Sequence, residues 1–219
     1  MNSTTFYSHG KLLLTGEYLV LDGAIALGLP TKKGQKLKVK TTQFSQQIHW
    51  ESKLADNSTW LSMDFQWNQN LNFSSEETSP EAQKLIEIFN YIASQKPELF
   101  QQKEHGFSFC SHLEFNKNWG LGSSSTLINN LAQWAKIDAF QLQFHAFGGS
   151  GYDIACAQNS TPIIYQKEEH QIKVEPTKFL PKFKDQLFFV YLKHHHNEEY
   201  FYGYQNFDPL PSFEPFQLT

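Results

Sequence analysis

A glycine- and serine-rich stretch near the middle of the chain combines residue types that can surround a phosphate group: Asn118-Trp119-Gly120-Leu121-Gly122-Ser123-Ser124-Ser125-Thr126-Leu127. Glycine lets the backbone approach an anion closely, and the first amides and positive dipole end of a following helix attract that anion. A helix is predicted to follow because apolar residues then recur at helical spacing, at Leu127, Leu131, Trp134 and Ala135. The serines can instead simply cap this helix, so the stretch alone leaves both interpretations open.

Two further segments place charged residues beside glycines. His9-Gly10-Lys11 leads through an apolar run into Gly16-Glu17-Tyr18, and Gly149-Ser150-Gly151-Tyr152-Asp153 precedes a second apolar run. A lysine near a carboxylate favours its ionised form, and a carboxylate can accept a proton from a hydroxyl. Simpler interpretations stay open: Lys11 as an exposed strand lysine, Glu17 as a solvated turn carboxylate, and Asp153 as a turn or cap residue.

The three segments, in this order, resemble the GHMP kinase superfamily of galactokinase, homoserine kinase, mevalonate kinase and phosphomevalonate kinase. The first segment is similar to the opening of mevalonate and phosphomevalonate kinases, and the second to the GLGSS phosphate loop of the family. The third resembles the Ser-Gly-x-Asp segment that carries the acidic residue of the active site. The sequence Gly-Tyr-Asp-Ile-Ala, at residues 151–155, is similar to a motif of a bacterial subgroup of this superfamily. The resemblance extends from about Tyr7 to about Leu192.

The resemblance implies ATP-dependent phosphoryl transfer to a small-molecule alcohol or phosphorylated alcohol, with ATP and Mg²⁺ as cofactors. It implies that Asp153 orients or deprotonates the acceptor hydroxyl and that Lys11 lies beside it. The substrate-binding residues that it implies are Glu17, Tyr18 and Ser150. The ATP-binding residues that it implies are Gly120, Leu121, Gly122, Ser123, Ser124 and Ser125, with Ser124 also binding Mg²⁺.

The chain departs from the family in two places before Leu192. Mevalonate kinases carry a glutamate upstream of the catalytic aspartate as a second Mg²⁺ ligand, whereas Gln141, Gln143 and His145 occupy that region here. The second magnesium ligand is therefore undetermined. Asp153 follows Gly122 by 31 positions, fewer than in mevalonate kinases, so we expect a shortened helical region between them.

The largest departure is at the end of the chain. Family members continue into a second α+β domain with a third glycine-rich motif, and no such motif follows Leu192. We expect an N-terminal ATP-binding domain over residues 1–180 and the start of a truncated C-terminal domain with an irregular tail over 181–219. The three consecutive histidines at 194–196 are interpreted as part of that tail rather than as a metal site. Two alternatives to a kinase stay open, a non-catalytic nucleotide- or metabolite-binding module and an inactive truncated product.

The expected fold class is α+β, a mixed sheet with helices packed on it, similar to the N-terminal domain of GHMP kinases and the second domain of ribosomal protein S5. Ser79-Pro80-Glu81 predicts the start of a helix that ends before Pro97, and a short helix is predicted at 140–146. Ala24 to Leu29 is a compact apolar segment that Pro30 is expected to close. Period-two patterns predict strands at 11–14, 18–21, 36–41, 47–50, 61–67, 107–115, 163–165, 172–175 and 186–192.

Composition narrows the class of protein. The formal charge of −4 over 219 residues gives no general attraction to nucleic acid or to an acidic membrane, and no apolar run is long enough to span a bilayer. The lysines between Lys32 and Lys40 alternate with apolar residues, which indicates the solvated face of a strand. Cys110 and Cys156 form no CxxC motif and no signal peptide precedes them, so we expect a cytoplasmic protein. The small-molecule alcohol expected as its partner is what the family resemblance implies. A homodimer is left open.

Overall fold

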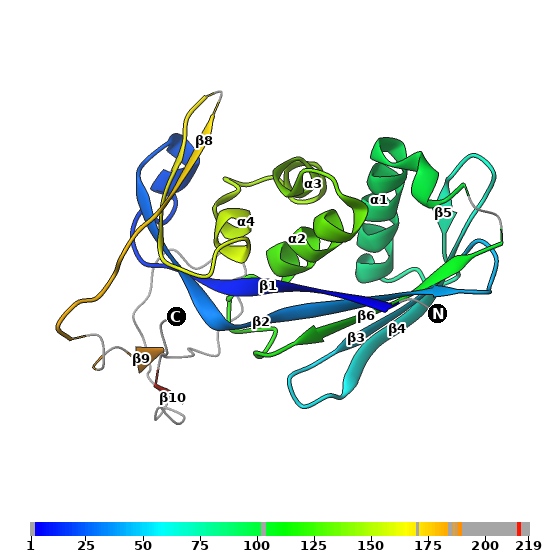
Figure 1. Ribbon diagram of the computed structural model, residues 1–219, viewed down its shortest axis with the longest axis horizontal. Helices are drawn as coiled ribbons and strands as arrows, with labels where there is room; N and C mark the ends of the chain where they lie inside the picture. Colours follow the sequence, from blue (N-terminus) through cyan, green and yellow to red (C-terminus); the bar gives the residue numbers. More distant parts are fainter. Residues whose placement is uncertain are drawn as a thin grey trace.

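The computed structural model describes residues 3–101, 104–169, 171–183, 186, 188–189 and 214–215. Most of this part of the chain forms a mixed eight-stranded sheet, and the described α-helices all lie on one of its faces (Figure 1). The strands are β1 (Ser3–Leu13), β2 (Ala26–Thr42), β3 (Gln47–Lys53), β4 (Thr59–Trp67), β5 (Phe73–Ser74), β6 (Gly106–Leu113), β7 (Ile163–Lys167) and β8 (Ile172–Pro176). The predicted α+β fold with a mixed sheet is confirmed.

The sheet is built around β2. Its strand order is β5-β4-β3-β6-β2-β7-β8, and β1 pairs with β2 in addition. Residues 35–42 of β2 pair with β6, residues 26–28 pair with β7, and β1 pairs with β2 from residue 28 to residue 40. The pairing of β3 with β6 is parallel, and the other pairings in this sheet are antiparallel.

We expected the apolar segment at 24–29 to end at Pro30. This expectation is wrong, because β2 continues through Pro30. Pro30 pairs with Lys11, next to the register shift between His9 and Lys11 in β1. A proline cannot donate to a strand ladder, and an irregularity in the pairing is a place where strands tolerate it.

The strand expected at 18–21 is also wrong. Residues Leu19–Asp22 form a short 3-10 helix, η1, bounded by residues with positive φ: Gly16 at 83°, Tyr18 at 62° and Gly23 at 88°. The Leu19 amide donates to the Glu17 carbonyl at 2.8 Å, which closes a γ-turn centred on Tyr18. These positive φ values reverse the chain after β1, so the apolar residues here cannot continue as a strand.

The helices are α1 (Pro80–Gln95), α2 (Ser123–Ala135), α3 (Ala139–Ala146) and α4 (Tyr152–Ala157), with a 3-10 turn η2 (Pro97–Leu99) after α1. As predicted, α1 follows an N-cap serine and ends before Pro97. The Ser79 hydroxyl accepts a hydrogen bond from the Ala82 amide at 3.3 Å. The helices predicted after the glycine- and serine-rich stretch and at 140–146 are confirmed as α2 and α3.

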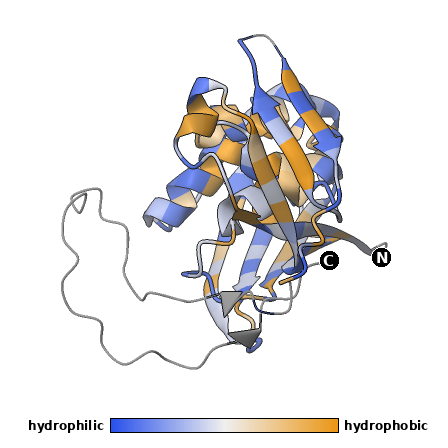
Figure 2. Ribbon diagram, turned by 90° about the vertical axis from the view of Figure 1, so that its left-hand side faces the viewer, coloured by the Kyte–Doolittle hydropathy of each residue, from blue (hydrophilic) through white to orange (hydrophobic). Residues whose placement is uncertain are grey.

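The two faces of the sheet differ in polarity because side chains alternate along each strand. The face under the helices carries a core that is rich in aromatic residues, including Trp50, Phe65, Trp67, Phe89 of α1, and Phe109. On the open face, Lys36, Lys38 and Lys40 are exposed, which confirms the predicted solvated lysine face. Figure 2 shows the alternation of hydrophobic and hydrophilic residues along the strands.

Near the end of the described chain, β9 (Phe188–Phe189) and β10 (Glu214–Pro215) form a separate two-stranded sheet. The strand predicted at 186–192 includes β9, and its remaining part lies largely outside the described residues, as do the three histidines at 194–196. The division of the chain at residue 180 stays a prediction. In the described part of the chain, no helix has the length and hydrophobicity that crossing a bilayer requires.

We expect Phe89→Ala to destabilise the fold by about 3–5 kcal/mol, because deleting a buried aromatic side chain loses its burial and leaves a cavity. Phe89 is fully buried, and its ring lies within 5.5–6.1 Å (centroid to centroid) of the rings of Trp50, Phe65, Phe73 and Phe109. Urea denaturation measures the loss. The control is Phe44→Ala, at a side chain 71% exposed, for which we expect a change within about 0.5 kcal/mol. Similar losses in the two variants would contradict the assigned core.

Candidate functional site

The glycine- and serine-rich stretch leads from the end of β6 into α2. Gly120 and Gly122 adopt φ values of 70° and 83°, in the left-handed region that favours glycine. Gly122 is the N-cap residue of α2 and has no side chain with which to cap this helix. The hydroxyls of Ser125 and Thr126 donate instead to the Gly122 carbonyl, at 3.0 and 2.9 Å. The hydroxyls of Ser125 and Thr126 therefore do not cap α2, and the first amides of α2 lack the side-chain acceptor that an N-cap residue usually gives them.

Strand β1 holds Lys11 against this loop. The Lys11 amide donates to the Leu121 carbonyl at 3.0 Å, beside the register shift that interrupts the pairing of β1 with β2. A Cβ placed on Gly122 would lie 3.1 Å from Lys11 Cγ and 2.8 Å from Ser125 Oγ. The loop therefore approaches β1 closely, and only glycine fits at residue 122 without displacing a neighbour.

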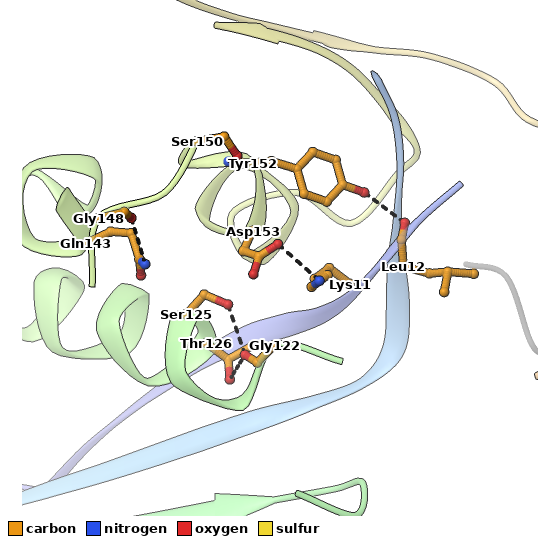
Figure 3. Close-up of polar contacts among 10 residues, drawn as sticks. All are labelled: Lys11, Leu12, Gly122, Ser125, Thr126, Gln143, Gly148, Ser150, Tyr152 and Asp153. Atoms are coloured by element: carbon orange, nitrogen blue, oxygen red, sulfur yellow. Dashed lines mark hydrogen bonds and ion pairs between the residues drawn. The ribbon is translucent and has the colours of Figure 1, made fainter. Parts of the chain in front are cut away.

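Asp153, in the first turn of α4, meets Lys11 in an ion pair with Nζ 3.3 Å from Oδ1 (Figure 3). The Lys11 side chain is 20% exposed and that of Asp153 is 39% exposed, so both charged groups are partly accessible to solvent. The structure thus brings together residues from all three sequence segments: Lys11 from the first, Gly122 from the second and Asp153 from the third.

The other predicted substrate residues occupy different positions. Ser150 lies just before α4, where its hydroxyl accepts a hydrogen bond from the Tyr152 amide at 3.2 Å. Glu17 and Tyr18 are exposed in the turn that follows β1. Tyr18 has φ 62° and ψ −45°, a strained conformation for a non-glycine residue. Such strain occurs at functional sites, but the roles of Glu17 and Tyr18 in binding stay predictions.

A cavity of about 460 Å³ adjoins the first turn of α2, within the size range of small-molecule sites. Ser123 and Ser124 line it on the side of the loop. Lys117 Nζ lies 4.4 Å from the centre of the Trp60 ring, and both residues line the same cavity. The apolar walls come from Trp50, Trp60, Leu61, Leu85, Ile88, Leu127 and Ile128.

The polar floor of this cavity is a part of the site that the sequence analysis missed. Gln35, Ser52 and Ser111 are buried on β2, β3 and β6 and line the cavity. They occupy inward positions of strands whose other inward residues are apolar, such as Trp50 and Phe109. A polar residue at an inward position of an alternating strand is the signal that could have identified them.

A larger hollow of about 770 Å³ lies beside β4 and β5. Its lining includes Lys40, His49, Asp64, Glu76 and Glu77, and none of the residues that the sequence predicts for the site. The smaller cavity is the one that adjoins the glycine-rich loop, through Ser123 and Ser124.

Solved structures that match this chain include small-molecule kinases. The L. major mevalonate kinase in complex with R-mevalonate matches with a TM-score of 0.58 and 13% identity, over 81% of this chain and 53% of that chain. The Lactococcus lactis galactokinase complexed with galactose matches with a TM-score of 0.57 and 15% identity, over 81% and 48%. A D-glycero-D-manno-heptose 1-phosphate kinase from Bacteroides thetaiotaomicron matches with a TM-score of 0.57 and 15% identity, over 84% and 62%. The described chain has the fold of the GHMP kinases.

At these identities the likeness concerns the GHMP kinase fold alone. The chain spans about half to three-fifths of the length of the three kinases. No protein-family model matches the chain, and no curated protein sequence matches it.

The loop of this GHMP-type fold can be tested by two glycine substitutions. Gly122→Ala and Gly120→Ala both place a side chain at positive φ, which costs roughly 1–2 kcal/mol of stability. We expect Gly122→Ala to cost more, because its Cβ meets Ser125 and Lys11, whereas no atom of the described residues lies within 4 Å of a Cβ at Gly120. Urea denaturation of both variants measures the difference. Equal losses would show that Lys11 and α2 do not pack against residue 122 as described.

Proposed function

We propose that this chain is an ATP-dependent kinase of the GHMP type that transfers a phosphoryl group to a small-molecule alcohol or phosphorylated alcohol. The observation that carries the proposal is the position of the loop before α2. On one side the loop adjoins a cavity of about 460 Å³, and on the other it contacts Lys11, whose ammonium is paired with Asp153. A nucleoside triphosphate has its parts in the same order: a base, a row of phosphates and a reactive terminal phosphate.

The loop suits the phosphates. The amides of Ser123, Ser124 and Ser125 begin α2 without a side-chain cap, so they can donate to phosphate oxygens while the helix dipole favours the negative charge. The left-handed backbone at Gly120 and Gly122 lets the main chain curve around an anion.

The cavity beside the first turn of α2 can accommodate the purine base of ATP. Its aromatic and aliphatic walls can cover the flat faces of a purine, and Gln35, Ser52 and Ser111 offer hydrogen-bonding groups beneath it. Trp60 and Lys117 lie at the same cavity and can stack on the ring and contact phosphate, respectively.

The oxygen donors present fit a Mg²⁺ ion that is held mainly by phosphate oxygens. Ser124 is exposed in the first turn of α2, and Asp153 provides a carboxylate. Gln143 Nε2 donates to the Gly148 carbonyl at 3.3 Å, while its Oε1 is buried without a partner among the described residues. The same part of the chain contains no cluster of three or more His, Cys, Asp or Glu residues. Mg²⁺ usually binds one or two protein oxygens together with substrate phosphates, and this donor set agrees with that preference.

The proposed chemistry follows from the paired charges. Asp153 Oδ2 or Oδ1 accepts a hydrogen bond from the acceptor hydroxyl and aims its oxygen at the terminal phosphate. Asp153 takes the hydroxyl proton as the new P–O bond forms, while the bond between the terminal phosphorus and the bridging oxygen breaks and ADP leaves. The Lys11 ammonium holds the Asp153 carboxylate in place and stabilises negative charge that develops on the transferred group. When bound, Mg²⁺ neutralises charge on the phosphates and polarises them for transfer.

The acceptor is proposed only as a class. The compared proteins are described as kinases of mevalonate, galactose and a heptose phosphate, and all three of these molecules carry hydroxyl groups. Within this class we favour an acceptor related to mevalonate or phosphomevalonate, because the motifs Gly16-Glu17-Tyr18 and Gly-Tyr-Asp-Ile-Ala point to that branch. We also propose a cytoplasmic location, with which the two free cysteines agree.

A second candidate function is nucleotide or metabolite binding without turnover. It rests on the loop and the cavity alone, which can hold a nucleotide whether or not Asp153 acts on an acceptor. Both candidate functions predict ATP binding, but only the kinase predicts turnover. One variant and one panel of assays therefore separate them.

We expect Asp153→Asn to lower turnover by about 10²–10⁴-fold, because the amide cannot accept the proton, while ATP binding stays nearly unchanged. Turnover is measured with mevalonate, phosphomevalonate, galactose and related alcohols, and binding by the ATP-induced rise in melting temperature. The control is Asp64→Asn, the same chemical change at a carboxylate 79% exposed beside His49. ATP stabilisation without turnover of any acceptor would favour the binding module, and equal loss of both in Asp153→Asn would mark Asp153 as structural.

We expect Trp60→Ala to weaken ATP binding roughly 5- to 150-fold, since stacking of a base on an aromatic ring contributes about 1–3 kcal/mol. Isothermal titration measures the affinity. Phe44→Ala serves as the control, because Phe44 lines the larger hollow beside β4 and β5. Loss of affinity in the Phe44 variant instead would place the base in that larger hollow.

A further inference from the structure

The ion pair of Lys11 and Asp153 joins two elements, β1 and α4, that are far apart in the sequence. We propose that the Tyr152 hydroxyl is a positioning group that holds Asp153 opposite Lys11. The kinetic consequence of this assignment rests on the proposed phosphoryl transfer, whereas the structural coupling does not.

A direct hydrogen bond links the two elements beside the ion pair. The Tyr152 hydroxyl donates to the Leu12 carbonyl at 2.8 Å (Figure 3). Tyr152 precedes Asp153 in α4, and Leu12 follows Lys11 in β1, so the hydrogen bond and the ion pair connect neighbouring residues of the same two elements. Together they close a small ring of contacts, which restricts how far α4 can move from β1.

The Tyr152 ring is fixed by its surroundings. Its side chain is almost completely buried, and it meets the Tyr165 ring edge-on with centroids 5.7 Å apart. A Cβ at Gly28 of β2 would lie 2.9 Å from Tyr152 Cε2 and 2.8 Å from Cys156 Sγ. The sheet therefore needs glycine at residue 28 to admit this ring. The Tyr165 hydroxyl also donates to the Ser150 carbonyl, which ties down the segment before α4.

The hydroxyl of Tyr152 acts as a donor and not as an acid or base. Burial, and to a smaller extent the neighbouring Cys156 and Asp153, raises the pKa of Tyr152 far above its ordinary value. The hydroxyl therefore keeps its proton at neutral pH and can donate it to the Leu12 carbonyl, which holds α4 against β1.

The opposite end of α4 is tied to β1 as well. Gln158, the residue after α4, donates from Nε2 to Asn129 Oδ1 at 3.2 Å, and Asn129 Nδ2 donates to the Ser8 hydroxyl at 2.8 Å. Ser8 belongs to β1, three residues before Lys11. A helix of six residues has little stability of its own, so its position depends on its tertiary contacts, which include these two links. The Tyr152 link is the one that adjoins Asp153.

The variant Tyr152→Phe removes only the hydroxyl and keeps the ring over Gly28. We expect kcat to fall about 10- to 100-fold, because small misplacement of a reacting group is costly, while the affinity for ATP stays the same. The matched control is Tyr7→Phe, which removes a hydroxyl that donates to the Lys32 carbonyl at 2.9 Å in another part of the sheet. A general loss of stability would affect both variants alike, whereas the proposal expects the drop in kcat in Tyr152→Phe alone. Unchanged kcat in Tyr152→Phe would overturn the assignment.

A double-mutant cycle tests the same assignment without turnover. The urea midpoint is measured for the wild type, Tyr152→Phe, Asp153→Asn and the double variant. If the hydroxyl positions Asp153 against Lys11, Tyr152→Phe lowers the midpoint more in the wild type than in the Asp153→Asn background. Equal shifts in the two backgrounds would overturn the assignment. Absence of turnover in the wild type would count against the proposed function only, because the cycle still decides whether Tyr152 and Asp153 are coupled.

Discussion

The backbone pairing of β2 is the interaction on which the rest of the structure depends. This strand runs from Ala26 to Thr42 and hydrogen-bonds to β1, β6 and β7, which in turn carry β3, β4, β5 and β8. A strand has only two edges, so β2 reaches three partners by pairing with β6 and β7 at different points along its length. The central strand must therefore be long, and it must pass through Pro30 without ending.

The position of the candidate site follows from this arrangement. Both α2 and α4 contact β1 and β2, on the face where the aromatic core excludes water. The loop before α2 consequently lies beside the strand that carries Lys11, and the first turn of α4 lies above the same strand (Figure 1). Buried hydrogen bonds from Tyr152 and Asn129 to β1 add directional constraints that hydrophobic packing alone does not give.

Much of the fold could be predicted from periodicity and capping. Ser79-Pro80-Glu81 marked the start of α1, and the alternation of lysines with apolar residues marked the open face of β2. The predictions that were wrong concern residues whose conformation depends on distant partners. The apolar residues at 18–21 suit a strand, but positive φ at Gly16 and Tyr18 turns the chain into η1, and Pro30 is accepted only because β1 is irregular beside it. The cavity floor at Gln35, Ser52 and Ser111 was missed because it combines three strands.

The sequence by itself determined the local elements: a glycine-rich loop followed by an amphipathic helix, a lysine after Gly10, and an aspartate after Gly151. Short-range spacing suffices for these features, because φ preferences, caps and helical periodicity act within a few residues. The tertiary structure alone decided that Lys11 Nζ and Asp153 Oδ1 lie 3.3 Å apart and that a cavity adjoins the loop on its other side. Those distances depend on the register of β1 against β2 and on the docking of α4, which are set by packing between residues far apart in the chain.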